Sequence, residues 1–304
     1  MARDTSADRP LLGILLMFGF CAVIPFADAL AKLLGKDFPL FQLIVVRFFT
    51  QALLFAPMAM MAGATLFPSR RVVALTALRA ALQIAGLLMM FSALRLLPLA
   101  DAVAIAFVMP FLLLLLGRFF LDEEVGPRRL IACAVGFIGT LMVVQPSFAA
   151  VGWAALLPMG VAVVFAFFML VTRAMAKEID PLALQASSGL LALPFVTPLI
   201  FFPVAEVAPL VGWVAPNGAE IWLFVALGIC GSIGHLLMTW SLRFAPSATL
   251  APMQYLEIPM ATLVGLVMFG DLPNGLAAAG IAVTIGAGLY IVFRERAVSR
   301  GAQT

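Results

Sequence analysis

Long apolar stretches recur along the whole chain, and short segments that carry charge, proline or glycine separate them. A helix of about 20 apolar residues is long enough to cross the roughly 30 Å hydrocarbon core of a bilayer. The pattern therefore predicts an all-α membrane protein with ten transmembrane helices. We expect these helices at about residues 11–33, 40–62, 72–95, 98–119, 128–145, 150–173, 182–203, 219–242, 247–269 and 275–293.

The composition argues against a water-soluble protein. Hydrophobic residues make up 64% of the 304 residues and charged residues only 11%, whereas a soluble domain carries roughly 25% charged residues. Lipid must therefore be the solvent for most of the surface. The net charge of +3 is scattered over helix ends and forms no stripe, so we expect no nucleic-acid partner.

Basic residues are distributed unequally between the two sides of the predicted bundle. With the N-terminus inside and the loops assigned alternately, the outer side holds only Lys32, Lys36 and Arg95. Cytoplasmic loops carry the excess of Lys and Arg, so we expect both termini in the cytoplasm and the chain in the cytoplasmic (inner) membrane. The inner side holds Arg3, Arg9, Arg70, Arg71, Arg118, Arg128, Arg129, Arg173, Lys177, Arg243, Arg294, Arg296 and Arg300.

One phrase occurs in both halves of the chain, LRLLPLAD at 94–101 and LRFAPSAT at 242–249. An ungapped comparison of 94–144 with 242–292 gives ten identical positions out of 51. We therefore predict two five-helix repeats, at 11–145 and 150–293. Because five is odd, the second repeat enters the membrane from the opposite side, and such inverted repeats are common in secondary transporters.

Small residues recur at every fourth position in the last helix of each repeat, where they let helix backbones approach closely in lipid. We expect these residues to pack the two repeats together. In the alignment the pairs are Ala132 with Gly280, Gly136 with Thr284, and Thr140 with Gly288.

Four segments carry recognisable motifs. They are FSALRLLPLADAVAIAFVMPFLLLLLGRFFLDEEVG at 91–126, LRFAPSATLAPMQYLEIPMATLVGLVMFGDLP at 242–273, QYLEIP within it at 254–259, and FPLFQLIVVRFF at 38–49. These segments resemble the EamA family of the drug/metabolite transporter superfamily, although Asp271 stands where a Glu is more common. The resemblance covers nearly the whole chain and implies a small-metabolite carrier in the cytoplasmic membrane.

Ionisable side chains inside membrane helices are costly and often mark a transport path. Glu257 is the first candidate, because it lies about ten residues into its helix, roughly 15 Å deep at 1.5 Å per residue. Gln254 and Tyr255 lie within one turn of it. A buried carboxyl group at this depth suits a proton-coupled step, and a structural hydrogen bond to a neighbouring helix is the alternative.

Four further residues join this candidate site, each with an alternative reading. Asp28 could instead pair with Lys32 on its own helix. Arg47 and Arg79 could bind a substrate carboxylate or phosphate, or could extend toward the membrane surface. Gln83 lies one turn deeper than Arg79 on the same face. His235 could relay protons or make a helix–helix hydrogen bond.

Prolines inside the predicted spans occupy matched places in the two halves. Pro25 and Pro158 fall in the first helix of each repeat, and Pro110 and Pro259 fall in the fourth. Proline removes a backbone donor and loosens a helix. We therefore expect hinges or cavity-lining backbone at these positions.

The motifs leave few classes of function. The sequence contains no GxSxG, HExxH, CxxC or P-loop, so we expect no enzyme, no cofactor and no metal.

We predict a secondary transporter of a small polar or amphipathic metabolite, such as an amino acid or a nucleobase-like or vitamin-like compound. We expect alternating access by rocking of the two halves against each other. Transport could be coupled to protons or not. The expected partners are a small-molecule substrate and the bilayer, in a monomer or a homodimer. A lipid-linked sugar flippase and a non-transport membrane sensor stay open as alternatives.

Overall fold

The computed structural model describes residues 9–97, 102, 105–123, 125–144, 152–203, 210–270 and 275–301. Over these residues all regular structure is helical. The elements are α1 (Pro10–Leu34), α2 (Leu40–Met61), α3 (Arg70–Leu96), α5 (Met109–Leu121), α6 (Pro127–Val144), η2 (Gly152–Ala155), α8 (Leu156–Met175), α9 (Pro181–Val196), η3 (Thr197–Phe201), α10 (Gly218–Phe244), α11 (Ser247–Leu250), η4 (Ala251–Leu256), α12 (Glu257–Phe269) and α13 (Gly275–Gly301).

Seven helical segments in the described part of the chain are long and apolar enough to cross a membrane, and two shorter apolar helices accompany them. Most predicted spans match an observed helix within a few residues, but two predicted spans are wrong in detail. The expected helix at 98–119 is interrupted by a turn at 107–108 before α5 begins, and its first residues, 98–101, lie outside the described residues. The expected helix at 247–269 is not a continuous α-helix, because η4 forms a 3-10 segment in its middle.

From the third helix of each half onward, equivalent helices keep a constant separation of 148 residues. Helices α3 and α10 both contain 27 residues and begin at 70 and 218, and α5 and α12 both contain 13 residues and begin at 109 and 257. Helices α6 and α13 begin at 127 and 275. The ungapped register of the two sequence halves is therefore also the register of their helices.

The equivalent helices also begin and end through the same local chemistry. Ser69 caps α3 by accepting a hydrogen bond from the Val72 N–H, and Asn217 caps α10 in the same way. Helices α5 and α12 both end at a residue in the left-handed conformation, Asp122 with a φ of 51° and Gly270 with a φ of 75°. Short polar residues and glycine tolerate this conformation, which ends a helix and reverses the chain.

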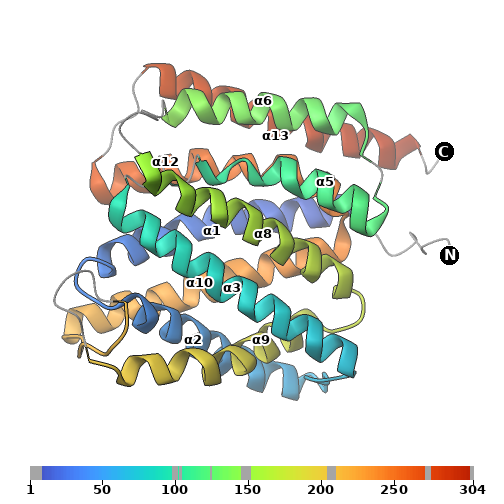
Figure 1. Cartoon of the computed structure of the whole chain (residues 1–304). Coiled ribbons are helices and arrows are strands. Elements are labelled where there is room, and N and C mark those ends of the chain that lie inside the picture. The colour runs from blue at the N-terminus through green and yellow to red at the C-terminus, as the bar shows by residue number, and fades with distance from the viewer. Residues whose placement is uncertain are drawn as a thin grey trace.

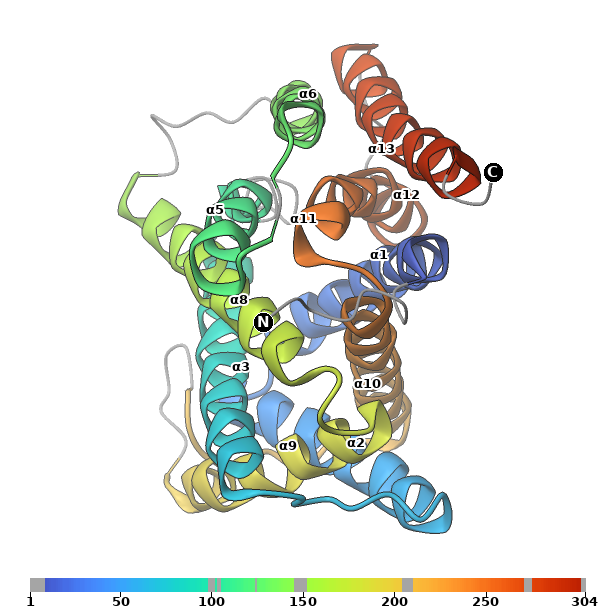
Figure 2. The same ribbon diagram turned by 90° about the vertical axis from the view of Figure 1, so that its right-hand side faces the viewer.

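Helices of the first half pack against helices of the second half rather than among themselves. Helix α1 lies against α10, α2 against α9, α3 against α8, and α6 against α13. Figure 2 shows the result as two stacks, one with α3, α8 and α5 and the other with α1, α10 and α12. The two five-helix halves are therefore interleaved and do not stand apart as two bodies.

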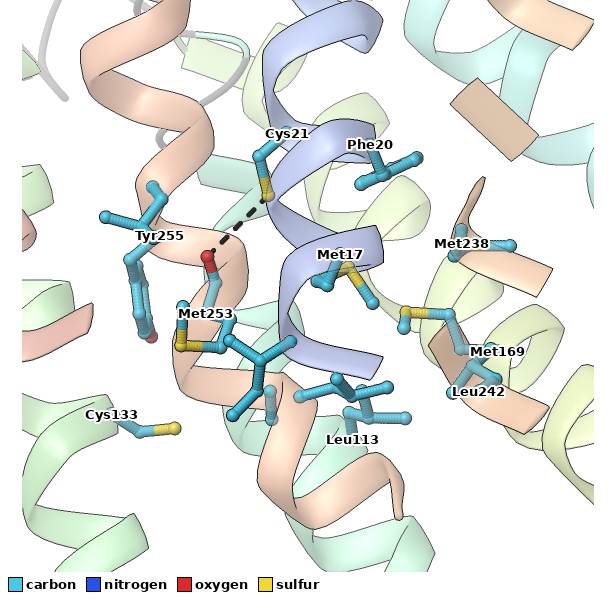
Figure 3. Packing of buried hydrophobic residues seen from close by; sticks show 14 of the residues in the cluster. Met17, Phe20, Cys21, Leu113, Cys133, Met169, Met238, Leu242, Met253 and Tyr255 are labelled. Carbon is cyan, nitrogen blue, oxygen red and sulfur yellow. Dashed lines mark hydrogen bonds between the residues drawn. The ribbon is translucent and has the colours of Figure 1, made fainter. Parts of the chain in front are cut away.

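A sulfur-rich apolar core joins the two stacks (Figure 3). Met17, Met169, Met238 and Met253 are each at most 1% exposed and pack with Leu113 and Leu242. These residues come from α1, α8, α10, η4 and α5. Methionine is unbranched and adaptable, so it fills an irregular junction between several helices without demanding one fixed packing.

Helices α6 and α13 approach each other most closely at Gly139. A Cβ atom at Gly139 would lie 2.9 Å from the Gly280 carbonyl oxygen and 3.0 Å from the Thr284 nitrogen. Two of the predicted packing residues, Gly280 and Thr284, thus face the partner helix. Two others face η4 instead, because a Cβ atom at Gly136 would meet the Tyr255 ring at 2.5 Å and one at Gly288 would meet Leu256 at 2.8 Å.

Candidate functional site

One cavity lies between the two stacks of helices and takes residues from both halves of the chain. Its free space amounts to about 740 Å³, a figure that includes the part open to solvent. Five residues singled out in the sequence line it together, namely Asp28, Arg47, Gln83, His235 and Glu257. Each of the five is at most 9% exposed, so the cavity holds a polar group of residues inside an apolar bundle.

Aromatic rings form much of the remaining wall. Phe20 of α1 and Phe165 of α8 face each other with ring centroids 6.3 Å apart and an interplanar angle of 23°. His235 packs beside both rings, at 6.3 Å and 6.2 Å between centroids. Phe107 adds a further ring from the turn before α5. Aromatic rings and polar side chains therefore line the same cavity, with His235 directly beside two of the rings.

Glu257 owes its position to a change of helix type. The residues before it form η4, and the N–H of Glu257 donates to the Gln254 carbonyl in the 3-10 pattern before α12 begins. Pro259 has no N–H to offer to the Tyr255 carbonyl four residues earlier. The regular α-helical pattern is thus lost on the N-terminal side of Pro259, and the carboxylate lies at the junction of η4 and α12, facing the cavity.

The freed backbone of η4 is satisfied by other parts of the bundle. The Cys21 thiol of α1 donates to the Met253 carbonyl at 3.6 Å, as Figure 3 shows. The Tyr255 hydroxyl donates to the Phe107 carbonyl at 3.3 Å, and the two rings lie 5.6 Å apart. Phe107 and Tyr255 are separated by 148 residues, so the two interrupted helices contact each other at equivalent positions.

The charged groups of the cavity influence each other without closing into ion pairs. Asp28 of α1 and Arg47 of α2 attract each other, whereas the two carboxylates, Asp28 and Glu257, carry like charge. Among the described residues, neither carboxylate has a basic group within 4.0 Å. The expected alternative for Asp28, a pair with Lys32, is not what its surroundings show, because Lys32 donates to the Leu97 carbonyl at 3.5 Å.

Three residues of the cavity wall have a buried polar atom without a hydrogen-bond partner. These atoms are Nη2 of Arg47, Oε1 of Gln83 and Nδ1 of His235. They come from three different helices, α2, α3 and α10. Buried polar atoms in proteins are nearly always paired, with protein or with water, so water or a polar ligand in the cavity would be able to complete these hydrogen bonds.

Arg79 belongs to a different environment, next to the cavity but not at its wall. Its guanidinium donates to the hydroxyls of Thr172 at 2.9 Å and Ser188 at 2.6 Å, with Thr239 at 3.4 Å. Its Cζ lies 4.5 Å from the centroid of the Phe168 ring. The expectation that Arg79 extends to the membrane surface is wrong, since the side chain is fully buried and joins four helices.

The remaining predicted residues lie behind the cavity wall. Gln254 is fully buried and donates to the Met169 sulfur at 3.2 Å, and Tyr255 is held by Phe107 as described above. None of the four prolines is among the described residues that line the cavity. Pro25 is buried within α1, and Pro110, Pro158 and Pro259 lie at the second or third position of α5, α8 and α12.

A second polar cluster ties several helices together at one end of the bundle, and we call it the Glu123 cluster. Glu123, just after α5, accepts hydrogen bonds from the Ser247 N–H at 3.1 Å, the Ser247 hydroxyl at 2.5 Å and the Ala248 N–H at 2.9 Å. Arg173 of α8 lies 3.4 Å from the same carboxylate and donates to the Leu242 carbonyl at 2.6 Å. The Glu123 side chain is only 6% exposed.

Sequence reasoning missed two of the rings in the cavity wall, Phe20 and Phe165, and the glycine that makes room for Arg47. Phe20 and Phe165 are two of 26 phenylalanines, and nothing in the sequence separates them from those that face lipid. Gly231 was also missed, although a signal existed. Gly228, Gly231 and Gly234 repeat at every third position of α10, which places them along one side of the helix.

Comparisons with known proteins agree with this fold. The sequence profile of the EamA-like transporter family matches residues 11–145 and 152–294. A riboflavin transporter of Rhizobium johnstonii is 32% identical over 65% of this chain and 63% of its own length. An S-adenosylmethionine uptake transporter of Rickettsia felis is 26% identical over 90% of both chains. A crystal structure of a protein at 21% identity superposes with a TM-score of 0.72 over 92% of this chain and 97% of that one, which shows the shared fold.

The apolar helices and the profile match together define a multi-pass membrane transporter, not an enzyme. The chain belongs to the EamA-like transporter family, as its two matched segments cover nearly its whole length.

Proposed function

We propose that this protein is a secondary active transporter that carries a small polar or amphipathic metabolite across the cytoplasmic membrane by alternating access. The observation that carries this proposal is the cavity, in which three unpaired polar atoms and two carboxylates face an enclosed space between two stacks of helices. A polar ligand would satisfy these groups, and no other part of the described chain offers them a partner.

The proposed topology has ten spans in two inverted repeats. Three composite segments count as single spans. In these segments η2 continues into α8, α9 into η3, and α11 through η4 into α12. The start of α1 and the end of α13 lie at the same end of the bundle, on the right-hand side of Figure 1. An even number of spans requires this arrangement. The excess of basic residues supports a cytoplasmic location for that end.

The proposed substrate combines a flat ring with a hydrogen-bonding polar group. The rings of Phe20, Phe107 and Phe165 offer stacking surfaces, and aromatic pairs contribute about 0.5–1.5 kcal/mol beyond the area they bury. Riboflavin and S-adenosylmethionine, which occur in the names of two relatives, are both compounds of this kind. They are therefore the first substrates to test.

The proposed mechanism uses the two mixed stacks as the moving parts. The cavity reaches toward the last turns of α1 and α3 and the first turns of α8, and the Glu123 cluster lies at the opposite end. The methionine-rich core separates the cavity from that cluster. We infer that this conformation faces outward, with the inner end closed. Release of the Glu123 cluster would let α5 and α8 move away from α10 and α11.

Transport itself can be tested with purified protein in proteoliposomes. We expect accelerated counterflow of labelled riboflavin or S-adenosylmethionine when unlabelled compound is trapped on the other side. The same measurement with Gln83→Leu should show a loss of uptake, because this change removes a polar group of the cavity and nearly keeps its volume. Saturable binding without counterflow would contradict the transport proposal and would point to a sensor.

A further inference from the structure

The side chain of Arg47 lies directly against the backbone of α10 at a glycine. A Cβ atom at Gly231 would lie 2.5 Å from both Cζ and Nη2 of Arg47 and 2.6 Å from its Nε. Real Cβ contacts are not this short, so any other residue at 231 must displace the guanidinium. The guanidinium is the far end of a flexible side chain that lines the cavity, so a Cβ atom at 231 would push it out of its present position at the wall.

Gly231 is one of three glycines that make room for side chains of the neighbouring helices. A Cβ atom at Gly228 would clash with Thr50 of α2, and one at Gly234 would lie 2.8 Å from Ile24 of α1. Only the Gly231 contact involves a charged group with an unpaired atom. All three glycines therefore allow close packing of α10 against its neighbours. Only at Gly231 does the neighbouring side chain, Arg47, bring a charged group to the cavity.

The guanidinium of Arg47 is poorly satisfied compared with the other buried arginine. Arg79 donates to three hydroxyls and stacks on Phe168. Nη2 of Arg47 has no partner, and the carboxylates of Asp28 and Glu257 are both farther than 4.0 Å away. An arginine nitrogen can only donate hydrogen bonds. Whatever pairs with Nη2 must therefore present an acceptor.

We propose that Gly231 is a positioning residue, which holds the Arg47 guanidinium at the cavity wall so that Nη2 donates to an oxygen acceptor of the substrate. This inference rests on the proposed transport function and adds the chemistry of one contact to it. The acceptor is a carboxylate oxygen or a ring carbonyl oxygen. Both groups suit a guanidinium, which binds them in the plane of its N–H groups.

The experiment compares matched alanine substitutions on one helix. Binding of riboflavin, which offers ring carbonyls, is measured by its fluorescence, and binding of labelled S-adenosylmethionine, which offers a carboxylate, is measured by equilibrium dialysis. We expect Gly231→Ala to weaken binding of the recognised probe by about 10- to 100-fold, as for the loss of a hydrogen bond to a charged group. Gly228→Ala, which crowds Thr50 one turn away, should change binding by less than about 3-fold.

A double substitution separates positioning from general damage to the fold. In an Arg47→Ala background no side-chain atom reaches the place of the guanidinium or of Nε, so a Cβ atom at 231 meets nothing there. Adding Gly231→Ala should then change neither binding nor the thermal unfolding temperature further. Gly231→Ala alone should lower that temperature. Equal effects of Gly231→Ala in both backgrounds, or unchanged binding in the single variant, would overturn the positioning role.

The probes also separate this inference from the proposed function. Wild-type protein that binds neither compound would contradict the proposed substrate class and the acceptor contact, whereas the unfolding temperatures would still decide the positioning role. Binding of riboflavin alone would identify a ring carbonyl as the acceptor. Binding of S-adenosylmethionine together with failure of its decarboxylated analogue would identify the carboxylate.

Discussion

The two buried arginines differ in how their donors are used, and this difference separates stability from binding. Arg79 holds hydroxyls of α8, α9 and α10 together, whereas Arg47 has an unpaired nitrogen at the cavity. A hydrogen bond to a charged group contributes about 1.5–3 kcal/mol. Arg79 should therefore matter mainly for the fold and Arg47 mainly for the ligand.

Replacement of each arginine by glutamine tests this division. Arg79→Gln should lower the free energy of unfolding by about 2 kcal/mol or more, because three contacts and the stacking on Phe168 are lost together. Arg47→Gln should lower it by less than half as much. Thermal unfolding in detergent measures both values, and equal losses would show that the contacts of Arg79 add little.

Glu257 is the cavity residue best placed to couple transport to protons. Glu257→Gln keeps the size of the side chain but removes its titratable group. We expect proteoliposome uptake to fall at least about 10-fold and to lose its dependence on pH between about 5 and 8, since proton transfer by positioned groups contributes factors of this order. Glu178→Gln, in an exposed pair with Arg71, serves as the control. Uptake by Glu257→Gln with an unchanged pH profile would remove Glu257 from the coupling step.

At the scale of elements, the fourth helix of each half is interrupted beside the cavity, before α5 in one half and at η4 in the other. Each interruption follows within 12 residues of the end of the third helix, which is α3 in one half and α10 in the other. The two interruptions contact each other through Tyr255 and Phe107. Non-helical backbone at membrane depth is tolerated where it is buried in protein or lines a cavity. The interruption of η4 meets this condition, because the Cys21 thiol and neighbouring helices surround it.

Close packing of α6 against α13 gives a sharp prediction for one glycine. Gly139→Ala would place a Cβ atom against backbone atoms of Gly280 and Thr284, which cannot turn away as a side chain can. We expect a loss of about 1–3 kcal/mol in the free energy of unfolding. Gly286→Ala, on α13 with open space at its Cβ position, should leave stability unchanged or raise it by up to about 1 kcal/mol through helix propensity. Thermal unfolding of the two variants should therefore move in opposite directions or differ clearly, and equal shifts would contradict this helix contact.

At the scale of the whole molecule, the arrangement is one cavity, one closed end and two mixed stacks. Each stack contains helices from both halves, so an exchange between two conformations would change contacts between stacks and keep the close pairs α1–α10 and α3–α8. In the alignment of the two halves, which are offset by 148 residues, Asp271 is equivalent to Glu123. Asp271 itself lies outside the described residues.

Removal of the Glu123 carboxylate should favour the opposite conformation. Glu123→Gln weakens the contacts with Ser247, Ala248 and Arg173. With Met17→Cys as a reporter in the methionine-rich core, we expect faster labelling by a membrane-impermeant maleimide from the cytoplasmic side, by about 5-fold or more, the population change that 1 kcal/mol produces. Natural cysteines are replaced beforehand, and Glu178→Gln again serves as the control. An unchanged labelling rate would show that the Glu123 cluster does not hold the inner end closed.

The sequence by itself determined the membrane setting, the repeat and the class of protein. Length and hydropathy of the apolar stretches depend only on local composition, and the 148-residue register appears in the letters because equivalent helices need equivalent residues at their caps and contacts. Glu257 and Arg47 could be singled out because a charged residue in an apolar helix is conspicuous wherever the helix packs. Only the tertiary structure decided which of these residues meet. It separated Arg79 from the cavity wall, brought Phe20 and Phe165 to it, and interleaved the two halves. These features depend on which side of each helix faces which neighbour, and in a helix that is apolar all round the sequence carries little information on that choice.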